Sequence, residues 1–347
     1  MRRRTFISAA VGGALAGLAG RQFFQPGIRS GTALPLYRSE TLPSGLRLFA
    51  GADLAFGTTI GIQLYHHDQR QAELAIEDAI HEAKKVDALM SIYDERSQVF
   101  QLNRDAYLAH PDPHLLRVLQ ESQRFSALTD GAFDITVQPL WLRFSQAAVD
   151  HALPSNAQRE TAKALVNWKN LLIGPDQIRF GNPAMAITLN GIAQGYAVDL
   201  ALAAVKARGI KHALLDTGEF ISAGTKTPAH QWTVGVQDPR MSDAFIAALE
   251  MDGRSVATSG DYETTFTPDF VHNHIFDPTT GDSPLELASV TVVAPTGLFA
   301  DGLSTALFVL GSEKAMALAA TLSNVDVLLV DKKGNSWKSP TLRESLA

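Results

Sequence analysis

The residues best suited to chemistry include a short stretch, HNHIFDPTTG, at 272–281. If this stretch is a strand, His272 and His274 point to the same face, because side chains alternate along a strand. Three interpretations are open: a metal clip, a catalytic histidine beside a turn, or a plain strand entering a turn. A structural zinc site would need two more ligands, and the chain has no cysteine to supply them. The residues from Asp277 to Gly281 predict a tight turn.

A second segment, FADGLSTALFVLG at 299–311, places Asp301 and Thr305 four residues apart in an expected helix. Residues at this spacing share one helix face. A carboxylate and a hydroxyl side by side suit a hard cation, with Mg²⁺ the best fit beside phosphate. The alternative, which the local pattern favours, is that Asp301 caps the helix start and accepts hydrogen bonds from its free N–H groups.

Two further segments are weaker signals. In LNGIAQGYAVD at 189–199, Gly191 and Gly195 bracket the entry to a helix, where free N–H groups favour an anion. Glycines at helix starts are common, and the chain contains neither the dinucleotide fingerprint nor a P-loop. ATSGDYETTF at 257–266 is a cluster of polar residues that predicts a turn. No GxSxG motif supports a serine hydrolase.

Hydrophobic periodicity gives the elements that must position these residues. Helices are expected at 71–90, 115–128, 156–166, 192–208, 299–310 and 313–322. Strands are expected within 46–66 (two) and at 170–180, 184–189, 211–216, 232–237, 244–250, 289–293 and 325–331. The strands at 170–180 and 184–189 are expected to form a hairpin around Gly181-Asn182-Pro183. The two types mix without a strict βαβ repeat, so the predicted class is α+β.

Composition narrows the possible functions. The 347 residues are 46% hydrophobic, with a formal net charge of −6. This is enough chain for one large domain, and it does not suggest a nucleic-acid-binding protein, which normally has a basic face. The absence of cysteine excludes disulfides, thiolate catalysis and cysteine-ligated metal sites.

The first twenty residues differ from the rest. RRTFI at 3–7 precedes a short run of small and apolar residues, which is typical of a twin-arginine export signal. The alternative is an uncleaved membrane anchor, but the run is too short to span a bilayer comfortably. Residues 21–45 are rich in proline and glycine and predict a linker. We therefore expect a periplasmic protein whose folded domain covers residues 46–347.

Taken together and in order, these segments resemble the ApbE family, the FAD:protein FMN transferases. The resemblance extends over essentially everything from about residue 46 onward. The matching segments are FGTTIGI at 56–62, MSIYDERSQVFQLN at 90–103, GAFDITVQPLW at 131–141, LNGIAQGYAVD at 189–199, TSGDY at 258–262, HIFDPTTG at 274–281, SVTVVAP at 289–295 and ADGLSTALFVLG at 300–311. LNGIAQGY, together with DTGE at 216–219 and the export signal, looks like the NosX-type branch, which serves the flavoprotein NosR in nitrous oxide respiration.

The resemblance implies a fold and a reaction. The fold would be a compact, two-lobed α+β unit of mixed sheets with packed helices, related to the T-fold. The enzyme would bind FAD with Mg²⁺ and transfer the FMN moiety to a Ser or Thr hydroxyl of an acceptor flavoprotein, releasing AMP. The acceptor would be NosR-like or another membrane electron-transfer subunit of the kind used in denitrification.

The resemblance also implies roles for particular residues. His274 would be the base for the acceptor hydroxyl, and imidazole has a suitable pKa for that task. The metal would bind to Asp301, Thr305 and the backbone carbonyl of Gly191. The residues expected to contact FAD or shape its pocket are Phe56, Tyr93, Phe133, Asp134, Ile135, Thr188, Gln194, Thr258, Asp261 and Ile275. His272 has no consistent counterpart in the family, and we treat it as surface or as a helper.

Three positions depart from the family pattern, and there FAD recognition is expected to differ in detail. Phe56 stands in place of methionine, Thr188 in place of a frequent aspartate, and Gln194 in place of lysine or glutamate. Two other functions remain open. The same site could split FAD into FMN and AMP with water as the acceptor, or the protein could carry FAD without catalysis, which the intact His274, Asp301 and Thr305 argue against.

Overall fold

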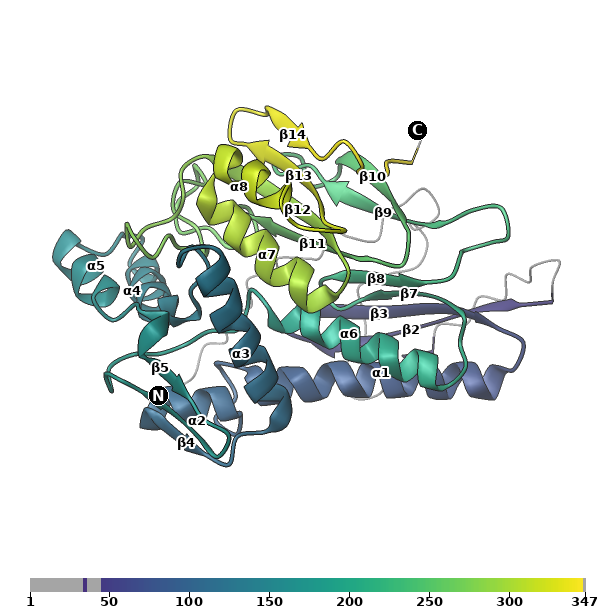
Figure 1. The fold of residues 1–347 in the computed structure, drawn as a ribbon, viewed down its shortest axis with the longest axis horizontal. Helices are drawn as coiled ribbons and strands as arrows, with labels where there is room; N and C mark the ends of the chain where they lie inside the picture. Colours follow the sequence, from purple (N-terminus) through teal and green to yellow (C-terminus); the bar gives the residue numbers. More distant parts are fainter. Residues whose placement is uncertain (1–33, 36–44, 346–347) are drawn as a thin grey trace.

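The computed structural model describes residues 34–35 and 45–345 (Figure 1). The predicted export signal and nearly all of the predicted linker lie outside the described residues. Within that linker, β1 (Leu34–Pro35) pairs with β2. In the described ranges, no helix has both the length and the apolar character needed to cross a bilayer.

A large antiparallel sheet forms the centre of the molecule. Its nine strands run in the order β1-β2-β3-β7-β8-β11-β12-β13-β14. After β1, they are β2 (Arg47–Ala55), β3 (Thr58–His66), β7 (His212–Asp216), β8 (Phe220–Ala223), β11 (Ser255–Gly260), β12 (Leu287–Ala294), β13 (Asp326–Asp331) and β14 (Ser336–Lys338). The register pairs Gly61 with Asp216, so the turn between β2 and β3 lies at the same end of the sheet as the turn after β7.

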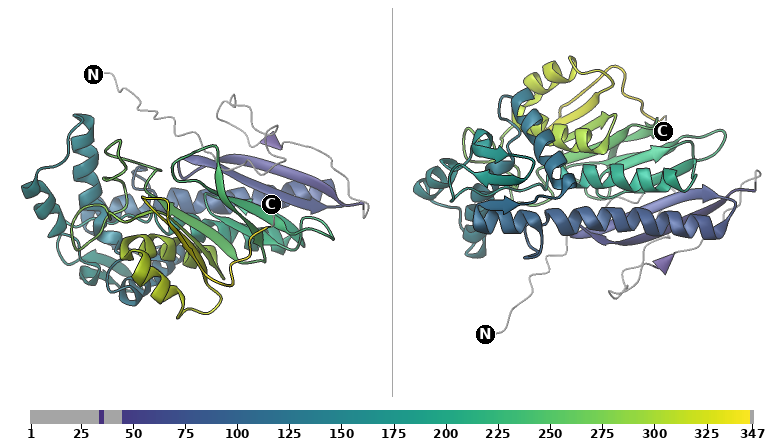
Figure 2. Two further views of the ribbon diagram at one scale, coloured as in Figure 1. Left: turned by 90° about the horizontal axis from the view of Figure 1, so that it is seen from above. Right: turned by 60° about the horizontal axis from the view of Figure 1, so that its bottom comes forward.

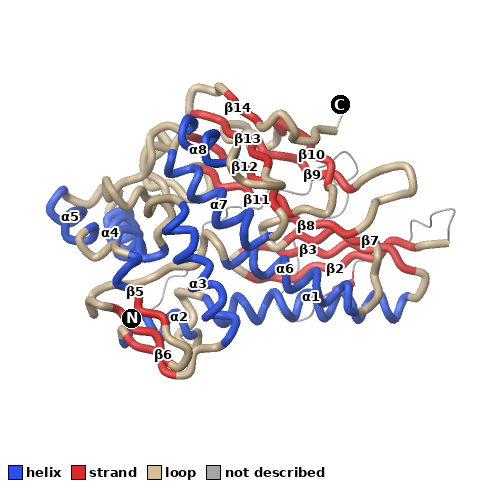
Figure 3. Tube along the Cα trace, in the orientation of Figure 1, coloured by secondary structure: helices blue, strands red, loops and turns tan. Residues whose placement is uncertain are grey.

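Both faces of the sheet are covered. One face packs on α1 (Gln69–Met90), α6 (Ala193–Ala207) and α7 (Gly297–Leu310), followed by α8 (Ser312–Ala319) (Figures 2 and 3). The hairpin of β9 (Trp232–Gln237) and β10 (Phe245–Met251) covers the opposite face, where Trp232 and Val234 pack with Val256 and Val293. Every residue of β12 is therefore buried, including the polar residues Ser289 and Thr291.

A smaller lobe is inserted between α1 and α6. It contains α2 (Gln98–Asp105), β4 (Tyr107–Ala109), α3 (Pro113–Leu128), a 3₁₀ turn η1 (Ile135–Val137), α4 (Gln138–Val149), α5 (Asn156–Lys163), η2 (Trp168–Asn170), β5 (Leu171–Ile173) and β6 (Gln177–Phe180). Strand β6 lies between β4 and β5 in a three-stranded sheet. The predicted α+β class and two-lobed arrangement are thus confirmed (Figure 1).

Most predicted elements occur within a few residues of their expected bounds, but one pairing is wrong. The sequence predicted a hairpin of 170–180 with 184–189, whereas β5 and β6 both lie inside 170–180. The backbone of Ile187 instead bonds to the side chain of Asn103, whose Oδ1 lies 2.7 Å from Ile187 N and whose Nδ2 lies 2.8 Å from Ile187 O. An amide side chain thus replaces the expected partner strand.

Helices α6 and α7 cross in direct backbone contact. A Cβ on Gly195 would lie 2.1 Å from the carbonyl oxygen of Gly297, and a Cβ on Gly297 would lie 2.3 Å from the carbonyl oxygen of Gly195. Asp199, one turn further along α6, accepts hydrogen bonds from Gly297 N at 2.7 Å and Leu298 N at 3.0 Å. The start of α7 is therefore fixed to α6 by two hydrogen bonds and by two glycines with no space for a side chain.

We predict that Gly195→Ala lowers the free energy of unfolding by about 3 kcal/mol, because the new methyl group meets rigid backbone rather than a movable side chain. Chemical unfolding monitored by fluorescence would measure the change. Gly61→Ala is the matched control: a Cβ there has no heavy atom within 4 Å, so a change of less than about 1 kcal/mol is expected. Equal stabilities of the two variants would contradict the crossing as a packing constraint.

Candidate functional site

Asp301 lies one turn inside α7 and does not cap it. The cap is Thr296, whose Oγ1 accepts a hydrogen bond from Phe299 N at 3.2 Å. The Oδ2 of Asp301 instead accepts a hydrogen bond from Gly195 N, 2.9 Å away on α6. The capping interpretation favoured by the local sequence is therefore wrong, because a contact between helices that are distant in sequence uses this carboxylate.

The environment of Asp301 opposes its negative charge. The side chain is 4% exposed. Burial raises its pKa to about 7, and the nearby carboxylate of Asp199 adds to the rise. A carboxyl group held in this way gives up its proton readily when a cation arrives, because the cation replaces the missing solvation.

Thr305 and Gly191 complete the predicted metal-binding group. A Cβ on Gly191 would lie 2.8 Å from Thr305 Oγ1, so the Gly191 backbone is directly beside this hydroxyl. Ser259 Oγ lies 3.1 Å from Thr305 Oγ1 and 2.7 Å from Ser304 Oγ. The structure thus brings Gly191, Asp301 and Thr305 together, and it adds Ser259, which the sequence did not indicate.

These donors suit a hard cation that shares its coordination with a ligand. The described residues contain no group of three or more His, Asp or Glu side chains arranged to hold a metal. A cation here would rest on one carboxylate, a hydroxyl and a backbone carbonyl, which are oxygen ligands of the kind Mg²⁺ takes. Mg²⁺ usually completes such a set with water and substrate phosphates.

Glu219, in the turn between β7 and β8, lies close to Asp301, and Asp216, the last residue of β7, lies close to Glu219. Burial raises the pKa of Glu219 well above its usual value, and the charge of Asp301 raises it further. Burial also raises the pKa of Asp216 to about 7. Thr258 N donates to Glu219 Oε2 at 3.2 Å, which links this turn to β11. Both residues belong to the DTGE segment noted in the sequence, but the proximity of Glu219 to Asp301 depends on the sheet order.

Gln194 and Phe56 lie at the same end of the sheet. Gln194 Nε2 donates to Thr217 O at 3.0 Å, and Thr217 Oγ1 donates to Gln194 O at 2.9 Å. Phe56 forms the turn between β2 and β3 with φ of 54°. The pairing of Gly61 with Asp216 brings that turn to the end of the sheet where the turn after β7 begins.

The segment 133–135 meets Thr188 through its backbone. Ile135 O accepts a hydrogen bond from Thr188 N at 2.8 Å. Phe133 is 3% exposed and packs on Phe125, with ring centroids 5.6 Å apart. Asp134 accepts hydrogen bonds from Thr136 N at 2.8 Å, from Thr136 Oγ1 at 2.6 Å and from Trp168 N at 3.0 Å.

Tyr93 differs from that segment, because it is 68% exposed. Its ring meets Trp141 edge-on, with centroids 6.3 Å apart. Of the aromatic residues predicted to contact FAD, Tyr93 therefore offers a surface, whereas the ring of Phe133 is part of the core.

His274 lies on the loop between β11 and β12 with one ring nitrogen engaged. Its backbone N donates to Thr264 O at 3.0 Å, and its Nδ1 lies 3.3 Å from the same oxygen. Because a carbonyl oxygen only accepts, Nδ1 carries the proton and Nε2 is left as the acceptor. Burial lowers the pKa of His274, which favours the neutral imidazole that a base requires. Next to it, Ile275 is buried, and its N bonds to Asn273 Oδ1 at 3.0 Å.

HNHIF does not form the strand that was considered for it. Its Asn273 makes only an isolated β-bridge, to Thr265. His272 is more than surface, since its Nδ1 lies 2.7 Å from Asp282 Oδ1 and its ring packs 6.0 Å from Phe144. The predicted tight turn is confirmed, because Gly281 N bonds to Asp277 O at 2.9 Å.

TSGDY is the expected turn only in part. Thr258, Ser259 and Gly260 belong to β11, and Asp261 and Tyr262 follow the strand in a turn. Asp261 is fully buried, and its carboxylate accepts from Arg240 Nη1 at 2.7 Å and Nη2 at 2.9 Å, with Lys332 Nζ 3.5 Å away. Its oxygens are therefore used by protein cations. No motif marks Arg240 or Lys332 in the sequence.

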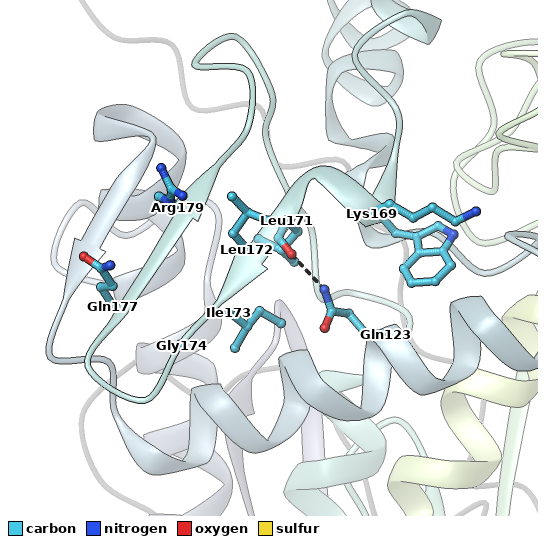
Figure 4. Close-up of a pocket in the computed structure, with 9 residues that line it drawn as sticks. Gln123, Lys169, Leu171, Leu172, Ile173, Gly174, Gln177 and Arg179 are labelled. Carbon is cyan, nitrogen blue, oxygen red and sulfur yellow. Dashed lines mark hydrogen bonds between the residues drawn. The ribbon is translucent and has the colours of Figure 1, made fainter.

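A cleft of about 580 Å³ lies beside α3 and the β5–β6 hairpin (Figure 4). Gln123 of α3 reaches across it to donate to Leu171 O at 2.8 Å. Its lining includes Trp168, Lys169 and Arg179, and none of the residues predicted for the site.

Comparisons with known proteins find relatives over most of the chain. A model of the ApbE family matches residues 56–329. The FAD:protein FMN transferase of Salmonella typhimurium is 32% identical over 278 residues, which is 75% of this chain and 78% of that protein. The FAD:protein FMN transferase of Vibrio cholerae is 29% identical over 297 residues, 81% of this chain and 87% of that protein.

Solved structures show the same fold. The flavin transferase ApbE from Vibrio cholerae superposes with a TM-score of 0.74 at 26% identity, covering 85% of this chain and 98% of that one. The ApbE protein from Thermotoga maritima superposes with a TM-score of 0.77 at 30% identity, with the same coverage.

We predict that Asp301→Asn stabilises the metal-free protein at pH 8 by on the order of 2 kcal/mol, and that this gain disappears near pH 4. The folded-state pKa of about 7 lies above the ordinary value of 3.8, so wild-type stability falls as the pH rises between them. Urea unfolding in EDTA at both pH values would measure this. Asp243→Asn, at an exposed aspartate, is the control. A gain that is equal at both pH values would contradict the prediction.

Proposed function

The chain belongs to the ApbE family, and from this we propose that it is an FAD:protein FMN transferase. The observation that carries the proposal is the end of β11. There Ser259 contacts the hydroxyl of Thr305, while Asp261, two residues later, is close enough to His274 to influence its charge. A candidate cation site and a neutral histidine with a free Nε2 are thus linked by one short segment. Transfer of a phosphoryl-linked group needs both a charge-stabilising centre and a base.

The proposed reaction balances as a single displacement. The acceptor hydroxyl oxygen forms a bond to the phosphorus of the FMN half of FAD, and the bond from that phosphorus to the bridging oxygen breaks. AMP leaves with the electron pair of that bond. The hydroxyl proton passes to Nε2 of His274, which is the nitrogen left open by the Thr264 contact.

Asp301, Thr305 and the Gly191 carbonyl would hold Mg²⁺, which when bound neutralises charge on the pyrophosphate. The protein would supply the ionised carboxylate of Asp301 as a ligand at this site. Tyr93 would cover the flavin nucleotide with its exposed ring, and Phe56, Thr188 and Gln194 would shape the remainder of the FAD pocket.

The compartment and the acceptor are also proposals. RRTFI at 3–7 supports export by the twin-arginine route to the periplasm, although these residues lie outside the described part of the chain. An acceptor there would be NosR-like or another membrane electron-transfer subunit, which would bring the enzyme to the membrane only through the acceptor. DTGE at 216–219 supports the NosR-like choice.

The transferase is tested by incubating the protein with FAD, Mg²⁺ and an FMN-binding acceptor domain, followed by intact-mass measurement. We expect an acceptor mass gain equal to FMN, located on one Ser or Thr, with AMP released in equal amount. EDTA should abolish the gain. Free FMN and AMP without acceptor modification would show the hydrolase instead, and unchanged FAD would show a carrier.

We predict that His274→Ala slows transfer by about 100-fold or more while FAD affinity changes little, because the base acts only on the acceptor hydroxyl. His230→Ala is the control, because it removes an exposed imidazole on the connection from β8 to β9, where it contacts Thr227. Single-turnover transfer and FAD titration would separate the two effects. Full transfer by the His274 variant would overturn the base assignment.

A further inference from the structure

Two cationic side chains from other parts of the chain bind the loop that carries His274. Asp261 begins this loop and is fully buried. Arg240, on the connection from β9 to β10, binds both carboxylate oxygens of Asp261, and Lys332, after β13, lies 3.5 Å from one of them. A buried carboxylate needs such partners, because an unpaired charge in the interior is strongly unfavourable.

The same two cations also contact the loop at Phe270, four residues before His274. Lys332 Nζ donates to Phe270 O at 2.7 Å, and the Arg240 guanidinium lies 4.4 Å from the Phe270 ring centroid. Phe270 has a φ of 61°, in the left-handed region that non-glycine residues rarely occupy. A residue persists in such a conformation only when its surroundings enforce it. Here Lys332 bonds to the carbonyl of Phe270, and Arg240 packs on its ring.

After Phe270 the chain doubles back, which brings His274 beside Thr264. Phe266 N bonds to His272 O at 2.8 Å, and His274 N bonds to Thr264 O at 3.0 Å. Thr264 O is also the acceptor for His274 Nδ1, so the position of residue 264 sets both the place and the tautomer of the imidazole. Restraining Asp261 and Phe270 therefore restrains this short hairpin at its base and at its tip.

We propose that Arg240 and Lys332 are positioning residues for the reaction: through Asp261 and Phe270 they hold the loop so that His274 Nε2 meets the acceptor hydroxyl. The proposal rests on the transferase function for its catalytic consequence, but not for its structural one. It assigns to the two cations no contact with FAD. Displacing a catalytic group by about 1 Å can reduce a rate by about 100-fold, so a modest loosening of the loop is sufficient.

Arg240→Met is the primary test, with Arg254→Met as its matched control. Arg254 makes a similar pair of ion contacts, 2.8 Å to Asp252 and 2.7 Å to Asp326, and it contacts none of residues 261–275. We expect Arg240→Met to lower the transfer rate by about 100-fold with FAD affinity within about twofold of wild type. Arg254→Met should keep the wild-type rate even if its melting temperature falls equally.

Hydrogen–deuterium exchange gives a readout that does not need activity. In Arg240→Met the amides of Phe266 and His274 should exchange at least about 10-fold faster than in wild type, while the amides of α7 stay protected. Arg240→Lys keeps the charge and should recover part of both effects. Lys332→Met, which leaves the Arg240 pair intact, is the milder variant to use if Arg240→Met does not fold.

Several results would overturn the proposal. One is slower transfer with unchanged loop exchange, which would mean that Arg240 acts directly on the substrate. Another is a loss of transfer in Arg254→Met as large as that in Arg240→Met, which would make the effect general instability. If the wild-type protein transfers no FMN at all, the proposed function fails, and the exchange data alone then decide whether the two cations fix the loop.

Discussion

The backbone contact between α6 and α7 is the constraint on which the candidate site depends. Gly195 and Gly297 have no space for a side chain, and this close approach lets Gly195 N reach Asp301 and lets Asp199 reach the start of α7. If the helices were separated by even one methyl group, both sets of hydrogen bonds would lengthen. The position of Thr305 beside Gly191 follows from the same crossing, since Gly191 directly precedes α6 and Thr305 lies on α7. The site is therefore a consequence of helix packing.

That packing concentrates carboxylates where water is scarce. Asp301, Glu219 and Asp216 are each destabilised as anions by burial, and the first two repel one another. Natural interiors usually pair such groups with a cation. Among the described residues, no lysine or arginine forms an ion pair with Asp301, unlike Asp261 and Asp326. By contrast, Asp261 and Asp326 are buried with arginine partners. The difference separates carboxylates that hold the fold from carboxylates that are suited to a cation arriving with its ligand.

The sequence predicted what is periodic or local. The helices carrying Asp301 and Gly195 were found because their apolar spacing is regular, and the turn at Gly281 because its residue types favour one conformation. The role of Asp301 could not be predicted from its neighbours in sequence, since a carboxylate near a helix start is normally a good cap. Here it bonds to a second helix instead. The predicted strand at 184–189 was wrong for a similar reason, because Asn103, from a distant part of the chain, makes hydrogen bonds to the backbone there. Arg240 and Lys332 had no signal at all, since only tertiary structure brings them to Asp261.

The two halves of the site are built with different rigidity, and the difference fits the roles proposed for them. The cation-binding residues stand on packed helices, where a rigid frame can place charge before a substrate arrives. His274 stands on a loop, where an incoming protein segment can approach it. A loop has few backbone restraints of its own, so its precision must come from side chains: Arg240 and Lys332 on one flank, and Asp282 on the other, which binds both His272 and Arg159. The paired histidines thus divide the work: His272 anchors the loop, which leaves the Nε2 of His274 free to accept a proton.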